Sequence, residues 1–216
     1  MHQGPGSDAW PLHFAPLAMK SACPKPPAMD GNELVKLARQ LYVDQLVGFL
    51  RNQFAKYPGG SAEVTTTRSS NPNLYGAHYR VDFVTGVQAN ANGSVVVELV
   101  PDNQLAFEPI TGSAGQTRVR VEQLNWDDVE ITHDLTGDLA PLLQPWFDHW
   151  YDPDDKRVSG PGQPPPDVIH SLGVYPGALV IDFGTASPDA FWSLVTILRD
   201  AGAKQLTARA TRQTAP

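Results

Sequence analysis

Residues 168–210 decide the fold: VIHSLGVYPG (168–177), ALVIDFGTAS (178–187), PDAFWSLVTI (188–197) and LRDAGAKQLTARA (198–210). Val168–Tyr175 and Ala178–Phe183 are two runs rich in β-branched and apolar residues, and Pro176-Gly177 separates them. Two such runs around a short turn predict a β-hairpin. Lys204–Ala210 has the same composition at the end of the stretch and predicts a closing strand.

A helix is predicted between the hairpin and the closing strand. Ser187 is suited to the N-cap and Pro188 to the first helical position, because proline has no N–H to leave unpaired there. Gly202 is a natural helix end. The apolar face is supplied by Ala190, Leu194, Val195, Ile197 and Leu198. A hairpin, helix and strand in succession indicate an α+β fold.

A long helix is predicted near the start of the chain. Asp30 and Glu33 have capping-box spacing, and apolar residues recur behind them at intervals of three and four. Residues 58–60, Pro-Gly-Gly, end this helix of about 25 residues. Its broad apolar stripe favours packing against a sheet.

A β region is predicted between the long helix and residue 133. Turn signals recur at intervals of about ten residues, which favours a mostly antiparallel meander of four to six strands. The predicted strands are Tyr75–Phe83, Ser94–Val100, Gln104–Pro109, Thr117–Leu124 and Asp128–His133. A second helix is predicted over Gly137–Tyr151, and Pro145 would remove one of its hydrogen bonds and could split it.

The domain organisation follows from the proline and glycine content. Residues 1–29 contain six prolines and no periodicity, so they predict a flexible arm or a tag. Residues 30–216 are predicted to form a single α+β domain with an exposed Gly/Pro loop at 159–166. A division into two domains at that loop is the alternative. It would leave only about 50 residues after the loop, which is small for an independent core.

Charge and cysteine content exclude several classes of protein. The net charge of −7 and pI near 5.2 argue against a nucleic-acid partner and against an anionic membrane surface. No apolar run reaches the length of a membrane span. The single cysteine, Cys23, rules out an internal disulfide and fits a reducing compartment, so a cytoplasmic location is expected.

The most unusual segment runs from Trp126 to Asp155. These thirty residues hold nine acids and no Lys or Arg, so their charge of −9 exceeds that of the chain, and the other 186 residues sum to +2. The same window contains three of the five Trp residues, together with Phe147 and Tyr151. Aromatic side chains ringed by carboxylates are typical of a surface that attracts and anchors a basic partner. The alternative is that the rings belong to the core and the acids only solvate its rim.

The window therefore supplies the predicted partner-binding residues. They are Trp126, Asp127, Asp128, Asp148, Trp150, Tyr151, Asp152, Asp154 and Asp155. The leading hypothesis is a non-enzymatic module that binds and blocks a basic protein. Bacterial immunity proteins, which inhibit nuclease-type toxins, are the functional class with that logic.

An enzyme is the alternative hypothesis. His133, Asp134, Asp148 and His149 are the candidate residues for a small hydrolase or a metal-dependent site. Neighbouring residues point apart on a strand or helix, so adjacency alone does not make a catalytic dyad. The acids between residues 148 and 155 do not fit the calcium-loop pattern, and no zinc, nucleotide or serine-hydrolase motif is present. The sequence thus predicts no catalytic residue, metal or cofactor.

Overall fold

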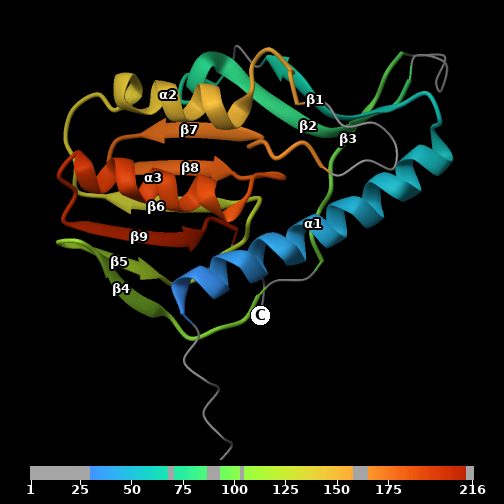
Figure 1. The fold of residues 1–216 in the computed structure, drawn as a ribbon. Helices are drawn as coiled ribbons and strands as arrows, with labels where there is room; N and C mark the ends of the chain where they lie inside the picture. The colour runs from blue at the N-terminus through green and yellow to red at the C-terminus, as the bar shows by residue number, and fades with distance from the viewer. Residues whose placement is uncertain (1–29, 68–70, 87–92, 103–104, 158–164, 213–216) are drawn as a thin grey trace, which may run out of the picture.

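The computed structural model describes residues 30–67, 71–86, 93–102, 105–157 and 165–212 (Figure 1). The α+β class predicted from the sequence is confirmed, with a long N-terminal helix and a mostly antiparallel six-stranded sheet. The predicted arm at 1–29 and most of the predicted loop at 159–166 lie outside the described residues.

In the described ranges, nine strands form two sheets. The small sheet contains β1 (Ser61–Thr67), β2 (His78–Val84) and β3 (Val96–Val97), all antiparallel. The large sheet has the order β4-β5-β9-β6-β8-β7. Its strands are β4 (Ile110–Ala114), β5 (Thr117–Val121), β6 (Val129–His133), β7 (Ser171–Tyr175), β8 (Ala178–Asp182) and β9 (Gln205–Ala210).

The strand order departs from a simple meander. The hairpins β4–β5 and β7–β8 pair consecutive strands, as expected. The last strand, β9, lies between β5 and β6, parallel to β5 and antiparallel to β6. Spacing between turns predicts individual strands, but it carries no information on which distant strands pair, so this insertion could not be predicted.

In the described ranges, three α-helices pack against one another and against the two sheets (Figure 1). The first, α1 (Gly31–Lys56), begins as predicted, with the Asp30 carboxylate accepting the Glu33 N–H at 2.8 Å. The second, α2 (Ala140–Tyr151), continues through Pro145 as one helix. The third, α3 (Pro188–Asp200), buries the predicted residues Ala190, Leu194, Val195 and Leu198.

One strand prediction was wrong, and one strand was not predicted. Residues 105–109 form no strand, and the chain enters β4 only at Ile110. β1 was missed because it lacks the usual alternation of apolar residues. Its one buried residue is Glu63, and a carboxylate in the inward position conceals the strand.

The small sheet joins the large one at β7. Arg80 of β2 donates its backbone N–H to His170 just before β7, at 2.7 Å, and Val174 of β7 donates to Asn73 at 2.8 Å. One hydrophobic core contains residues of α1, α2, α3 and the large sheet. Within the described ranges, no helix has the length and apolar character needed to cross a membrane.

Candidate functional site

The aromatic rings of the acidic window are part of the core. Trp126, Trp146, Phe147, Trp150 and Tyr151 are all at most 8% exposed. Trp126 stacks on Phe183 with ring centres 4.6 Å apart, and Phe147 stacks on Tyr151 at 4.7 Å. The structure therefore shows the alternative in which the rings are buried, and Trp126, Trp150 and Tyr151 offer no exposed ring to a partner.

The first acids of the window are held by the end of β9. Asp127 and Asp128 both form ion pairs with the Arg212 guanidinium, and Asp128 also accepts the backbone N–H of Arg212 at 2.6 Å. Burial raises the pKa of Asp127, while Arg212 acts in the opposite direction. These two carboxylates thus share one guanidinium, which offsets part of their charge within the chain.

The last acids of the window also have cationic partners. Asp152, buried at the end of α2, accepts the backbone N–H of Arg157 at 2.6 Å. Exposed Asp154 lies 2.7 Å from the Lys156 ammonium. Asp155 lies 2.7 Å from the buried guanidinium of Arg80. Of the predicted contact residues, Asp148 is the one that is exposed and forms no ion pair in the described part of the chain.

The outward surface of α2 is where the remaining exposed groups gather. Pro141, Leu142, Pro145, Asp148 and His149 are all exposed, and Leu142 is 41% exposed. They lie opposite the buried residues Leu143, Trp146, Phe147 and Trp150, at the spacing of one helix face. Asp138 caps the start of this helix by accepting the Ala140 N–H at 2.9 Å. We call Asp138, Pro141, Leu142, Pro145 and Asp148 the α2 surface.

An open hollow of about 510 Å³ adjoins the α2 surface at Asp138. It is lined by residues 135–139, His133 and the turn between β7 and β8, and the described lining residues include no Lys or Arg. Burial lowers the pKa of His133, so this imidazole is neutral near pH 7. The hollow therefore adds no fixed positive charge beside Asp138.

The four residues of the enzyme hypothesis have separate partners. Asp134 accepts the backbone N–H groups of Lys204 and Gln205 at the start of β9. Asp148 accepts from the Gln144 amide at 2.7 Å, and His149 makes an edge contact with Trp150. Within the described residues, no hydrogen bond or ion pair joins His133 or Asp134 to Asp148 or His149. Among the described residues, no group of three or more His, Cys, Asp or Glu is placed to hold a metal ion.

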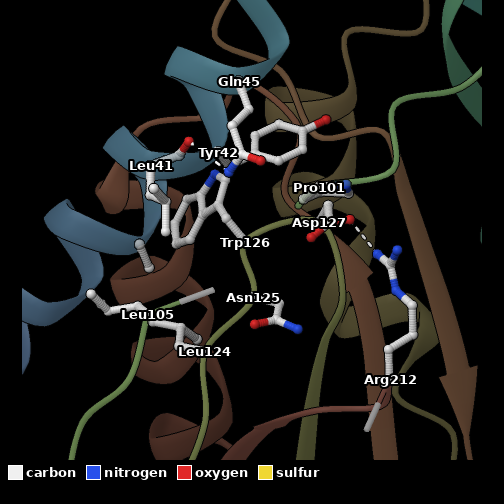
Figure 2. Close-up of a pocket in the computed structure, with 11 residues that line it drawn as sticks. Leu41, Tyr42, Gln45, Pro101, Leu105, Leu124, Asn125, Trp126, Asp127 and Arg212 are labelled. Atoms are coloured by element: carbon white, nitrogen blue, oxygen red, sulfur yellow. Dashed lines mark hydrogen bonds and ion pairs between the residues drawn. The ribbon is translucent and has the colours of Figure 1, made fainter. Parts of the chain in front are cut away.

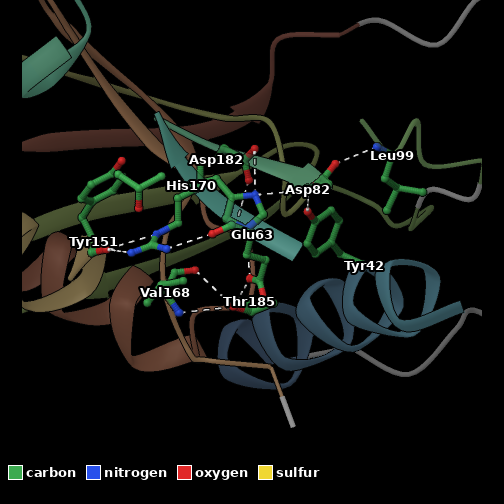
Figure 3. Close-up of polar contacts among 12 residues, drawn as sticks. Tyr42, Glu63, Asp82, Leu99, Tyr151, Val168, His170, Asp182 and Thr185 are labelled. Atoms are coloured by element: carbon green, nitrogen blue, oxygen red, sulfur yellow. Dashed lines mark hydrogen bonds and ion pairs between the residues drawn. The ribbon is translucent and has the colours of Figure 1, made fainter. Parts of the chain in front are cut away.

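The densest cluster of titratable side chains lies elsewhere, around His170 (Figure 3). The His170 ring is buried where the two sheets meet, and carboxylates face both of its nitrogens. Nε2 lies 3.2 Å from Glu63 of β1, while Nδ1 lies 3.4 Å from Asp82 of β2 and 3.7 Å from Asp182 of β8. We call these four residues the His170 cluster.

Further groups fix the carboxylates of the His170 cluster. Thr185 donates its hydroxyl to Glu63 at 2.8 Å. Asp82 accepts the Leu99 N–H at 2.7 Å and the Tyr42 hydroxyl of α1 at 3.4 Å. The Glu98 carboxylate accepts the backbone N–H of Asp82 at 3.2 Å. The cluster therefore links α1, the small sheet and the large sheet through polar contacts.

The electrostatics of the His170 cluster favour a charged imidazole. Burial opposes that charge, but Asp182, Glu63 and Asp82 together outweigh it and raise the pKa of His170 to about 9. Burial, assisted by Asp82 and Asp127, raises the pKa of Asp182 to about 7 despite the nearby imidazolium. Since both imidazole nitrogens already face carboxylates, the arrangement suits holding a charge rather than binding a metal or accepting a substrate proton.

Arg80 provides a second buried cation beside the His170 cluster. Its guanidinium donates to the backbone carbonyls of Glu63, Tyr151 and Asp152 at 2.9–3.3 Å, and it pairs with Asp155. The guanidinium also lies over the Tyr151 ring, 5.1 Å from its centre. Arg80 thereby ties the end of α2 to the small sheet.

A small hollow lies between α1 and the 124–127 segment (Figure 2). Trp126 lies beneath α1 there, and Asp127 points toward Arg212. The Asn125 Oδ1 and Trp126 Nε1 atoms on its wall are buried without a hydrogen-bond partner in the described structure. With a volume of about 30 Å³, the hollow has room for a water molecule but not for an organic ligand.

The His170 cluster was missed because its members are far apart in the sequence. Glu63, Asp82, His170 and Asp182 come from four different segments. Two weak signals existed: Asp82 lies in a strand of mostly apolar character, and His170 lies just before the hairpin. No protein family, curated protein or solved structure was found to match this chain.

Proposed function

We propose that this chain is a non-enzymatic protein-binding module that engages a basic partner through the α2 surface. The observation that carries the proposal is the composition of that surface. Leu142 and two prolines are exposed on one helix face, and the carboxylates of Asp138 and Asp148 flank them without an ion pair to any described residue.

The apolar part of the surface supports the proposal because the outward face of a helix is ordinarily polar. Exposed apolar side chains rimmed by polar groups are typical of contact sites. Pro145 lies inside α2, where a proline costs the helix a hydrogen bond, and its ring is exposed. A partner that covers Pro141, Leu142 and Pro145 would bury that apolar surface.

The charge of the surface supports a basic partner over an acidic one. Residues 126–155 contain no Lys or Arg, and the hollow beside Asp138 is lined without them. At the far end of α2, Arg157 already bonds to Asp152, to the Asp167 carbonyl and to the His149 carbonyl. A lysine or arginine of the partner could pair with Asp138 and Asp148.

An inhibitor of the immunity type, acting on a basic toxin in a reducing compartment, is the specific form of this proposal. The logic is that a nucleic-acid-cleaving enzyme has a basic active site, which an acidic surface can block. The proposal differs from the sequence prediction in its contact residues. Of the nine predicted residues only Asp148 remains, and the outward side of α2 replaces the aromatic rings and the other acids.

A peptide selection tests the proposal without knowledge of the partner. Twelve-residue random peptides on phage are selected against the immobilised chain, and the bound peptides are then measured against L142S/D148N. The expected result is enrichment of Lys or Arg next to apolar residues, with at least tenfold weaker binding to the variant, about 1.4 kcal/mol. Binding should also weaken steeply between 50 and 300 mM salt, because added salt screens the charges.

The matched control is L37S/D189N. Leu37 is exposed to the same extent as Leu142, 41%, and Asp189 is an exposed acid in the first turn of α3. This control changes charge and apolar surface equally but lies on other helices. Equal loss of binding in both variants, or selected peptides without excess basic residues, would overturn the proposal.

A further inference from the structure

Among the described residues, the outer edge of β4 has backbone N–H and C=O groups without a hydrogen-bond partner. β4 ends the large sheet, opposite the edge formed by β7 (Figure 1). The N–H groups of Arg118 and Glu122 point away from β4 and donate to the Lys204 and Ala208 carbonyls. The alternate residues Val119 and Val121 therefore bond to β4. Thr111 and Ser113, which lie between the bonded positions of β4, therefore direct their N–H and C=O groups outward.

A groove of about 440 Å³ runs beside this edge. Its walls are the start of α1, the inner face of β4 and β5, and Trp192 of α3. Gly112 leaves it open, since a Cβ atom at that position would meet nothing within 4 Å. The Trp192 indole N–H is buried without a hydrogen-bond partner in the described residues. The groove thus has apolar walls and lies directly beside the free edge of β4, with room for additional side chains.

We propose that the segment Trp10–Phe14 of this same chain binds this groove as a strand added to β4. In an extended segment alternate side chains share one face, and Trp10, Leu12 and Phe14 occupy alternate positions. Main-chain hydrogen bonds to Thr111 and Ser113 would position the segment, and the groove would take its apolar side chains. This surface is separate from the α2 surface, so the inference does not depend on the proposed function.

The position of the chain favours this occupant over a foreign peptide. The described structure begins at Asp30, which itself lines the groove. The fifteen residues between Phe14 and Asp30 can span up to about 50 Å. A crossover between parallel strands needs a dozen or more residues, so the connection is long enough for either strand direction.

Pro11 selects the parallel direction. In a parallel pair, two residues joined by a backbone hydrogen bond point their side chains to opposite faces of the sheet. The end of β5 shows this: Glu122 donates to the Ala208 carbonyl of β9, and Ala208 shares the buried face with its pairing partner Val121, opposite to Glu122. Residues that fill the groove would then bond to Thr111 and Ser113. Pro11 would direct its ring nitrogen to solvent, the position that proline tolerates at a sheet edge.

Amide hydrogen exchange of the full chain tests the proposal. We expect the Thr111 and Ser113 amides to exchange at least tenfold more slowly than unprotected amides. The variant W10S/F14S should remove that protection, while the control H13S, on the opposite face of the added strand, should leave it within twofold. G112V should also remove it, because the valine would fill the groove from within.

Three results would overturn the proposal. Thr111 and Ser113 amides that exchange at unprotected rates in the natural chain would show an unoccupied edge. Protection that W10S/F14S leaves unchanged would assign the edge to another occupant. Protection that disappears on dilution would show that a second copy of the chain covers β4.

Discussion

Replacing His170 by glutamine removes the positive charge of the His170 cluster while keeping a polar side chain. In the natural chain the imidazole lies between Glu63, Asp82 and Asp182 and is fully buried. Glutamine can donate a hydrogen bond, but it cannot neutralise a carboxylate. We therefore expect H170Q to fold with reduced stability and to lose part of the pH dependence of unfolding.

The magnitude follows from the pKa of His170, which rises from its ordinary value of 6.5 to about 9. A difference of this size between the folded and unfolded states corresponds to about 3 kcal/mol of folding stability. Because the folded pKa is the higher one, this stabilisation is fully present below pH 6.5 and is lost as pH rises through 9. The raised pKa of Asp182, about 7, also makes the folded state prefer the proton, so its ionisation lowers stability as pH rises from about 4 to 7.

Urea unfolding at pH 7 and at pH 9.5 measures the effect. With a denaturant slope of about 2 kcal/mol/M, the midpoint of the natural chain should fall by about 1.5 M between the two values. The midpoint of H170Q should start lower at pH 7 and fall less than that of the natural chain, because Asp182 still loses its proton over this range, so the two proteins converge at pH 9.5. H149Q, which changes an exposed histidine, should follow the natural chain. A natural chain whose midpoint is constant or rises over this range, or an H170Q curve parallel to it, would refute the assignment of a charged His170.

Three further substitutions test other parts of the structure. R80M should lower the free energy of unfolding by about 3–5 kcal/mol, because it leaves three backbone carbonyls without their donor. R80K should recover little of this loss, since one ammonium cannot reach all three carbonyls. Calorimetry of both variants measures the effect, and full recovery of stability in R80K would contradict it. L143A should lower the free energy of unfolding by about 2–5 kcal/mol, while the neighbouring L142A should lower it by less than about 0.5 kcal/mol, because Leu143 is fully buried and Leu142 is not. Equal losses of stability in urea unfolding would contradict the assignment of which face of α2 is buried. T185V should cost about 1–3 kcal/mol, because the fully buried hydroxyl donates to Glu63, and T185S should restore most of it; a stable T185V would mean that this hydrogen bond contributes nothing.

Local sequence patterns predicted most of the helices and hairpins. The Asp30 cap and the turn at Pro176-Gly177 each act within a few residues, so their structural effect can be read directly from the chain. Ser187 stands at the N-cap of α3 as predicted, although its side chain makes no cap hydrogen bond. The same reasoning failed for β1, where Glu63 occupies the buried position that an apolar residue would mark. It also could not place β9 between β5 and β6, because pairing of distant strands depends on the whole packing.

The acidic window illustrates what charge counting misses. Its net charge of −9 suggested one strongly acidic face, but the cations that pair with it come from distant segments, such as Arg80 and Arg212. Its aromatic side chains are buried: those of α2 lie on the inward face of that helix, and Trp126 lies in the core beneath α1. The His170 cluster forms where four segments distant in the sequence meet, so no pattern within one segment could predict which residues come together.

The most direct test of the proposed function is an NMR map of a selected basic peptide bound to the ¹⁵N-labelled chain at low salt. We predict that the amide shifts concentrate on residues 138–149 and the adjoining hollow, and that they disappear in L142S/D148N but persist in L37S/D189N. Shifts that fall elsewhere on the chain, or that are the same in both variants, would contradict the assignment of the α2 surface as the site of partner binding.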